Sequence, residues 1–141
     1  MPSISPEKIG AVMALTPLPH SYAELELRVA DGLPKEALRA SIERVCPGSE
    51  GRRLLHRIVP EATLKRRQER LSAEESGRAE RLARVYATAL HVWSTDEDAR
   101  AFLQAPHPML EGRAPLEVSL SELGARRVEE LLWQLYFGLP V

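Results

Sequence analysis

Basic side chains gather in one stretch of this chain, and contact with phosphates is the chemistry that their number and spacing would support. Between positions 52 and 70 the local charge is +5, whereas the whole 141-residue chain has a net charge of −1. The basic residues of this stretch are Arg52, Arg53, Arg57, Lys65, Arg66, Arg67 and Arg70. A basic island in an otherwise acidic chain favours a surface that contacts nucleic acid, and a solvated helix face is the alternative.

Residues that commonly carry catalysis or bind metals are scattered along the chain. His20, His56, His91 and His107 stand too far apart for a local metal motif, and no Gly-rich phosphate loop or nucleophile elbow is found. The single cysteine, Cys46, excludes an internal disulfide and is typical of a small buried side chain. The sequence therefore predicts no enzyme and no catalytic, metal-binding or cofactor-binding site.

The elements that would position the basic residues are helices. Hydrophobic residues make up 44% of the chain and aromatic residues only 5%, a composition that favours helices packed on Leu, Ala and Val. No segment alternates as a strand does, so the predicted fold class is all-α. No apolar run reaches the roughly 20 residues that span a bilayer, and residues 1–15 lack the pattern of a secretion signal. We therefore expect a cytoplasmic protein that makes no membrane contact.

Turn signals divide the first half of the chain into an arm and several short helices. Four prolines predict a flexible N-terminal arm over residues 1–20, with at most a short helix around 7–15. Helices are then expected at 22–30, 34–45, 50–58 and 61–71, the last with basic residues on its outer face. Short helices joined by tight turns favour a helix-turn-helix domain over residues 21–71, used for DNA binding and dimerisation.

The second half predicts longer helices. Ser72 and Glu75 form a capping box that marks the start of the strongest helix, with an apolar stripe from Leu82 to Trp93. Thr95, followed by three acidic residues, predicts another helix start. A last helix is expected from about 122 to 137, and an apolar tail follows it. Residues 72–141 are expected to form one helical domain.

The stretch from 63 to 141 resembles the Xre/MbcA/ParS antitoxins, which are partners of RES-domain toxins. The residues that carry the resemblance are Thr63-Leu64-Lys65-Arg66-Arg67, Leu71-Ser72, Glu75-Ser76, Arg81-Leu82-Ala83-Arg84-Val85, Ala89, Phe102-Leu103, Pro106, Leu110, Gly112, Pro115-Leu116, Gly124-Ala125, Val128, Leu132 and Gly138. Residues 32–57 are more weakly similar to the divergent helix-turn-helix of that family.

The chain departs from the family pattern at three turns. Pro60 stands where the family often has a short polar residue, and Glu111 stands where it frequently has glycine. At Trp93-Ser94-Thr95 the family commonly has a Phe-Gly-type turn. None of these positions carries a catalytic group in the family.

The resemblance implies an antitoxin with an N-terminal Xre-like helix-turn-helix part, followed by a C-terminal helical toxin-binding domain. It implies a cognate RES-domain toxin that consumes NAD or uses it to modify a target. It also implies a homodimer within a hetero-oligomeric complex, and repression of the operon through operator DNA. The alternative is a stand-alone helix-turn-helix transcriptional regulator with a C-terminal dimerisation domain.

The basic helix supplies the predicted DNA contacts. Arginine can pair bidentately with guanine, while lysine and threonine can meet phosphates. The alternative for these side chains, above all for Arg67, is to brace a neighbouring helix. The predicted DNA-binding residues are Thr63, Lys65, Arg66, Arg67 and Arg70.

The end of the chain supplies the predicted toxin contacts. A rigid helix followed by a short apolar peptide and a carboxylate can plug a concave nucleotide pocket, and a proline lowers the entropic cost of ordering that peptide. The alternative is a frayed terminus. The predicted toxin-binding residues are Phe137, Gly138, Leu139, Pro140 and Val141.

Overall fold

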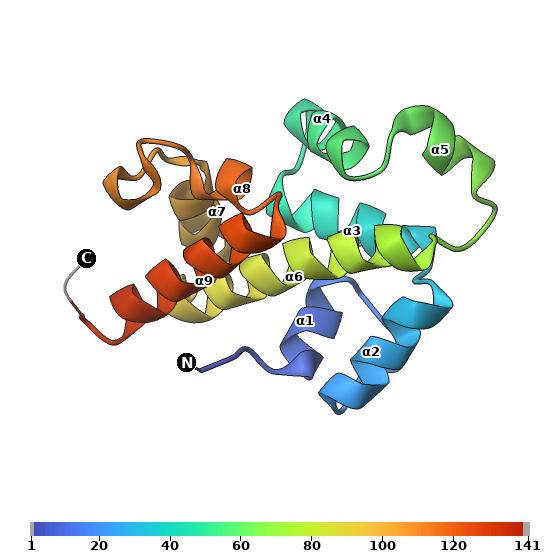
Figure 1. Cartoon of the computed structure of the whole chain (residues 1–141), viewed down its shortest axis with the longest axis horizontal. Helices are drawn as coiled ribbons and strands as arrows, with labels where there is room; N and C mark the ends of the chain where they lie inside the picture. Colours follow the sequence, from blue (N-terminus) through green and yellow to red (C-terminus); the bar gives the residue numbers. More distant parts are fainter. Residues whose placement is uncertain (1, 140–141) are drawn as a thin grey trace. The chain divides into compact units, whose positions relative to one another are not determined.

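The fold is given by a computed structural model, which describes residues 2–139 (Figure 1). Over this range the chain forms helices joined by turns, with no strand longer than an isolated bridge, so the all-α prediction is confirmed. The helices are α1 (Pro6–Val12), α2 (Tyr22–Asp31), α3 (Lys35–Val45), α4 (Ser49–Ile58), α5 (Glu61–Arg66), α6 (Ala73–Trp93), α7 (Asp96–Gln104), the 3-10 turn η1 (Pro108–Leu110), α8 (Pro115–Val118) and α9 (Glu122–Tyr136). Each helix in this range is too short or too polar to cross a bilayer.

Contacts between residues divide the chain into two compact units. The N-terminal unit is Ser5–Ala83, and the C-terminal unit combines Met1–Ile4 with Arg84–Val141. The division lies inside α6, whereas the sequence analysis places a boundary between residues 71 and 72. The first residues of α6 contact the N-terminal unit because the capping box fixes them beside the segment that follows α5.

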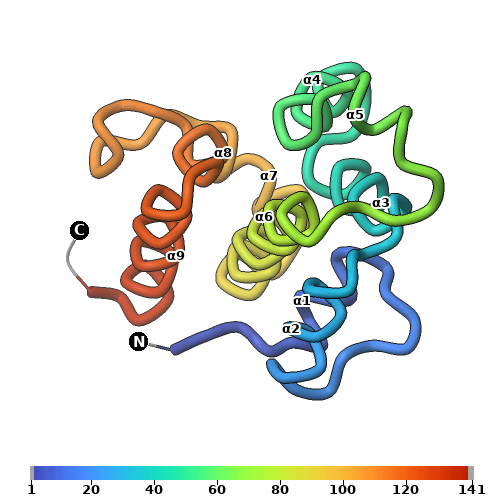
Figure 2. Tube along the Cα trace, turned by 45° about the vertical axis from the view of Figure 1, so that its right-hand side comes forward, coloured from blue at the N-terminus to red at the C-terminus, as the bar shows by residue number. Residues whose placement is uncertain are grey.

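The N-terminal unit is built from short helices that follow one another through tight turns (Figure 2). The turn at Pro47 and Gly48 separates α3 from α4, which pack on each other, and Val59-Pro60 separates α4 from α5. These helices share a core of aliphatic side chains, since β-branched and Leu residues recur on their inner faces. Its fully or nearly buried members include Leu38, Ile42, Val45, Leu54, Ile58, Val59 and Leu64.

Residues 5–15 belong to the predicted flexible arm, but in the structure they are packed into the N-terminal unit. Ser5 caps α1 by accepting a hydrogen bond from the Lys8 amide, and α1 contacts α2 and α3. Ile9, Val12 and Met13 are buried. The prolines misled the prediction because Pro6 occupies the first helical turn, where its missing N–H is not needed.

The helix predicted to run from 61 to 71 is wrong beyond Arg66. Residues 67–71 are not helical and bend at residues 68 and 69. They pair with residues 33–35 through two backbone hydrogen bonds, from the Lys35 amide to the Glu69 carbonyl (2.9 Å) and from the Leu71 amide to the Leu33 carbonyl (2.8 Å). A Cβ at Gly32, which has φ +97°, would lie 2.4 Å from the Leu71 carbonyl oxygen. The close approach of these two segments therefore requires glycine, and the pairing competes with helix formation.

In the C-terminal unit, α7 contacts α8 and α8 contacts α9. Arg84 of α6 donates to the Glu129 carboxylate of α9 at 2.9 Å, and both side chains are mostly buried. Burial raises the pKa of Glu129, while the charge of Arg84 opposes that rise. The ion pair fixes the rotation of α9 against α6. The apolar core around it includes Val85, Ala89, Val128, Leu131 and Leu132.

Two of the three departures from the family pattern fall at residues with left-handed backbone. Ser94 has φ +74° and Glu111 has φ +56°. Such angles cost L-residues about 1 kcal/mol, which glycine avoids. Glu111 is held by Arg113 (2.9 Å) and by Arg127, whose hydrogen bonds lower the pKa of its carboxyl to about 2. Within residues 2–139, no hydrogen bond or ion pair holds the Ser94 side chain.

Replacing Ser94 by glycine is therefore expected to raise the free energy of unfolding by up to about 1 kcal/mol. Thermal unfolding followed by circular dichroism measures this effect. Glu111→Gly is the matched control, since it relieves the same backbone angle but removes the bonds to Arg113 and Arg127. A lower melting temperature for Ser94→Gly would show that the left-handed turn is not strained.

Candidate functional site

Helices α4 and α5 carry an exposed basic surface. The hydrophobic sides of both helices face the core through Leu54, Ile58 and Leu64, which leaves the charged side chains in solvent. We call these side chains the basic surface: Arg52, Arg53, Arg57, Lys65 and Arg66. A turn connects α4 to α5 at Val59-Pro60, so α5 occupies the second position of a helix-turn-helix arrangement.

Three of the predicted DNA-binding residues lie on α5. Lys65 forms an exposed ion pair with Glu61 (3.3 Å), and the Lys65 hydrogen bond and charge lower the pKa of Glu61. Arg66 donates to the Thr63 hydroxyl at 3.4 Å. Such surface contacts are weak, so a phosphate or base edge can displace them at little cost. Thr63 is half-buried, whereas Lys65 and Arg66 are exposed.

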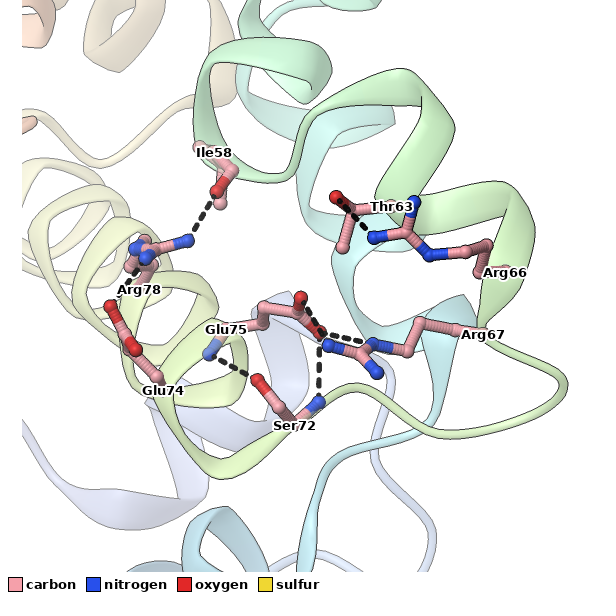
Figure 3. Close-up of polar contacts among 8 residues, drawn as sticks. All are labelled: Ile58, Thr63, Arg66, Arg67, Ser72, Glu74, Glu75 and Arg78. Carbon is pink, nitrogen blue, oxygen red and sulfur yellow. Dashed lines mark hydrogen bonds and ion pairs between the residues drawn. The ribbon is translucent and has the colours of Figure 1, made fainter.

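Arg67 is engaged inside the N-terminal unit. Its Nε and Nη2 each donate to the Glu75 carboxylate at 3.0 Å, a bidentate pair visible in Figure 3. The Glu75 side chain is only 7% exposed and also accepts from the Ser72 amide at 2.8 Å. The Arg67 hydrogen bonds, followed by the Ser72 amide, lower the pKa of Glu75 against the opposing effect of burial. This geometry corresponds to the bracing alternative for Arg67.

Arg70 also makes an internal contact. Its Nη1 donates to the Gly32 carbonyl at 2.7 Å, next to the bridge between Pro34 and residue 70. Lys35 adds a hydrogen bond from its Nζ to the Arg67 carbonyl at 2.9 Å. These bonds attach residues 67–70 to residues 32–35, so the C-terminal end of α5 is held in place. The structure thus separates the five predicted residues into three on α5 and two in the segment that anchors it.

The buried carboxylate predicts a specific acid sensitivity. Because the pKa of Glu75 lies below its ordinary value of 4.5 in the folded protein, its pairing stabilises the fold fully above that value. The stabilisation is lost as the pH falls through the lower, folded pKa. We expect Glu75→Gln, which keeps a carbonyl for the Ser72 amide, to lower stability at neutral pH and to flatten the loss of stability on acidification.

Thermal unfolding at a series of pH values from about 3 to about 7 measures this slope. Glu74→Gln is the matched control, because Glu74 is exposed and pairs with Arg78 at the same helix end. Equal slopes for the Glu75→Gln variant and the unmodified protein would contradict the role given to the Arg67–Glu75 pair.

The end of α9 presents an aromatic cluster, defined here as Trp133, Tyr136, Phe137 and His91. Trp133 stacks on Phe137 with ring centroids 6.1 Å apart, and its edge meets Tyr136 at 5.6 Å. His91 of α6 lies 5.4 Å from Trp133 and 5.0 Å from Tyr136. Trp133 is 5% exposed, whereas Phe137 is 56% exposed. The buried ring of Trp133 thus packs against the exposed ring of Phe137.

The backbone after the cluster is also fixed. Gly138 adopts φ +68°, its amide donates to the Leu135 carbonyl (3.2 Å), and the Leu139 amide donates to the Gln134 carbonyl (2.9 Å). This is a helix C-terminus of the type that glycine favours. Leu139 is 53% exposed. The predicted contacts Pro140 and Val141 lie outside the described residues.

Sequence reasoning missed part of this surface. The predicted toxin contacts include neither His91 nor Tyr136, although Trp133 and Tyr136 are three residues apart on one helix and must be neighbours. Among residues 2–139, no three His, Cys, Asp or Glu side chains come together as a metal site would require.

Comparison with known proteins agrees with the two units. Residues 24–84 match the antitoxin Xre-like helix-turn-helix domain, and residues 88–138 match the antitoxin Xre/MbcA/ParS C-terminal toxin-binding domain. A protein of Pseudomonas putida named Antitoxin Xre is 30% identical over 132 residues, which cover 90% of this chain and 81% of that protein. The basic surface falls in the first matched domain and the aromatic cluster in the second. The chain therefore belongs to the Xre/MbcA/ParS family of antitoxins.

Proposed function

We propose that this antitoxin neutralises a RES-domain toxin by closing the toxin's NAD site with the end of α9 and the tail that follows. The observation that carries the proposal is a pair of large apolar side chains, Phe137 and Leu139, that remain more than half exposed on a fixed helix end. The contact residues are those predicted from the sequence, joined by Tyr136 of the aromatic cluster.

The geometry favours insertion into a concave site. Burial of an exposed Phe or Leu side chain contributes about 1.5–3 kcal/mol, and a pre-ordered backbone reduces the entropy lost on binding. Trp133 supports Phe137 from behind, so that Phe137 need not reorganise on entry. Nucleotide pockets are concave and largely apolar, which suits a plug of this shape.

The helix-turn-helix domain would bind operator DNA, which would make the protein a repressor of its own operon. Thr63, Lys65 and Arg66 would contact DNA from α5, and the arginines of α4 would contact flanking phosphates. Arg67 and Arg70 would act indirectly by fixing α5. We further propose a homodimer within a hetero-oligomeric complex with the toxin, because operators read by helix-turn-helix proteins are commonly two-fold symmetric.

Co-expression with the RES-domain protein encoded by a neighbouring gene tests the proposal. The two proteins are expected to purify together, and the complex is expected to consume NAD far more slowly than the toxin alone. A RES-domain protein that does not bind, or that stays fully active when bound, would contradict NAD-site closure. Retained operator binding in that case would favour a stand-alone transcriptional regulator.

A further inference from the structure

We propose that Pro2, Ser3 and Ile4 form a strap that holds the end of α9 in its toxin-binding orientation. The first residues of the chain would then be a working part of the C-terminal unit, although the rest of the N-terminal region belongs to the helix-turn-helix unit. The effect on the toxin rests on the proposed function, whereas the contact itself does not.

The strap and the residues that follow it belong to different compact units. Met1–Ile4 group with Arg84–Val141, while Ser5 onward groups with the N-terminal unit. Ile4 is only 4% exposed. In Figures 1 and 2 the dark-blue chain starts near the C-terminal end of α9 and then leads away from that helix. An apolar residue so close to a chain end is buried only when the segment is held in place.

The strap meets one face of α9. Pro2 and Ser3 line a cavity of about 260 Å³ together with four residues of that helix. The four are spaced at i, i+3, i+4 and i+7, which places them along a single stripe. They are Arg126, Glu129, Glu130 and Trp133. Pro2 and Ser3 therefore border a stripe of α9 that ends at Trp133.

The stripe connects the strap to the proposed toxin contacts. Its last member, Trp133, stacks on Phe137 and touches Tyr136. Its second member, Glu129, is paired with Arg84 of α6. The ion pair thus fixes the middle of α9, and Pro2 and Ser3 border the same stripe as far as Trp133, the residue that stacks on Phe137. Loss of the strap would expose Trp133 and free Phe137 to change orientation.

Tryptophan fluorescence tests the contact without any toxin. In a Trp93→Phe background, Trp133 is the only tryptophan of the chain. Deletion of residues 2–3, or Ile4→Ser, is expected to shift the Trp133 emission to longer wavelength and to increase its quenching by acrylamide. Ile4→Val is expected to restore the original spectrum. An unchanged spectrum in both strap variants would overturn the proposal, provided that far-UV circular dichroism shows an intact helical fold.

Inhibition of the co-purified RES-domain enzyme tests the consequence. Because an unsupported Phe137 and tail must be ordered on binding, the strap variants are expected to inhibit about tenfold less tightly. Operator affinity should stay unchanged, and Leu27→Ser, an exposed position of α2, is the matched control. A shifted spectrum with unchanged inhibition would overturn the positioning role. If the unmodified protein fails to inhibit, the proposed function fails, and the fluorescence result still decides whether the strap exists.

Discussion

Deletion of residues 138–141 is expected to weaken neutralisation of the toxin by about 100-fold or more. The deletion removes Leu139, Pro140 and Val141, and burial of each apolar side chain contributes about 1–3 kcal/mol. Loss of two such contributions corresponds to about 100-fold in affinity. The deletion starts after α9 and removes only the hydrogen bonds that the Gly138 and Leu139 amides make to the last turn of that helix, so the protein should stay folded.

The measurement is the rate of NAD consumption by the toxin at increasing antitoxin concentration. Leu123→Ala is the matched control, since Leu123 is a still more exposed apolar residue at the opposite end of α9. Phe137→Ala should weaken inhibition in the same direction, because it removes the ring supported by Trp133. Unchanged inhibition by the truncated protein would show that the tail is a frayed terminus.

The double variant Lys65→Ala, Arg66→Ala is expected to bind operator DNA about 10- to 100-fold more weakly, with an unchanged melting temperature. Both side chains are exposed, and their internal partners Glu61 and Thr63 are lost at little cost. A lysine that contacts a phosphate releases a counterion, so Lys65→Ala alone should lower the slope of affinity against salt by about one. Arg66→Ala should weaken sequence preference if the guanidinium reads a base edge.

Fluorescence anisotropy with the promoter fragment at several salt concentrations measures both quantities. Arg39→Ala is the matched control, because Arg39 is a surface arginine of α3 that pairs loosely with Glu36 (3.7 Å). Arg67→Ala should behave differently and lower both the melting temperature and DNA affinity, since it breaks the bidentate pair with Glu75. A salt slope that does not change in the double variant would exclude phosphate contact by Lys65.

Most helices could be predicted because their signals are local. The capping box at Ser72 and Glu75 forms as expected, and so do the helix start at Thr95 and the stop at Gly138. The glycine positions of the resembled family also identify the left-handed turn at Ser94. Each of these features depends on side chains and backbone groups within about four residues, so the sequence contains all the information needed.

The errors occur where distant segments meet. Residues 67–71 leave the helix because residues 33–35 offer backbone partners, and Gly32 allows the approach. The helix α1 is buried because α2 and α3 cover its apolar side. Neither residues 33–35 nor the helices α2 and α3 can be recognised as partners from the local sequence pattern. The prolines of residues 1–20 indicate a flexible arm, and the basic residues of 61–71 indicate the outer face of one continuous helix. Tertiary pairing overrides such local preferences.

The amino-acid sequence by itself determined the all-helical class, the family, the basic character of the α4–α5 region and the apolar end of the chain. The tertiary structure decided which basic side chains are held by distant residues, since Arg67 and Arg70 differ from Arg66 in the partners that folding brings to them. It also decided that Ile4 is buried with the C-terminal unit. Composition and periodicity are properties of residues that are neighbours in sequence. Whether a charged side chain has an internal partner, and whether Trp133 is buried, depends on residues that only folding brings near.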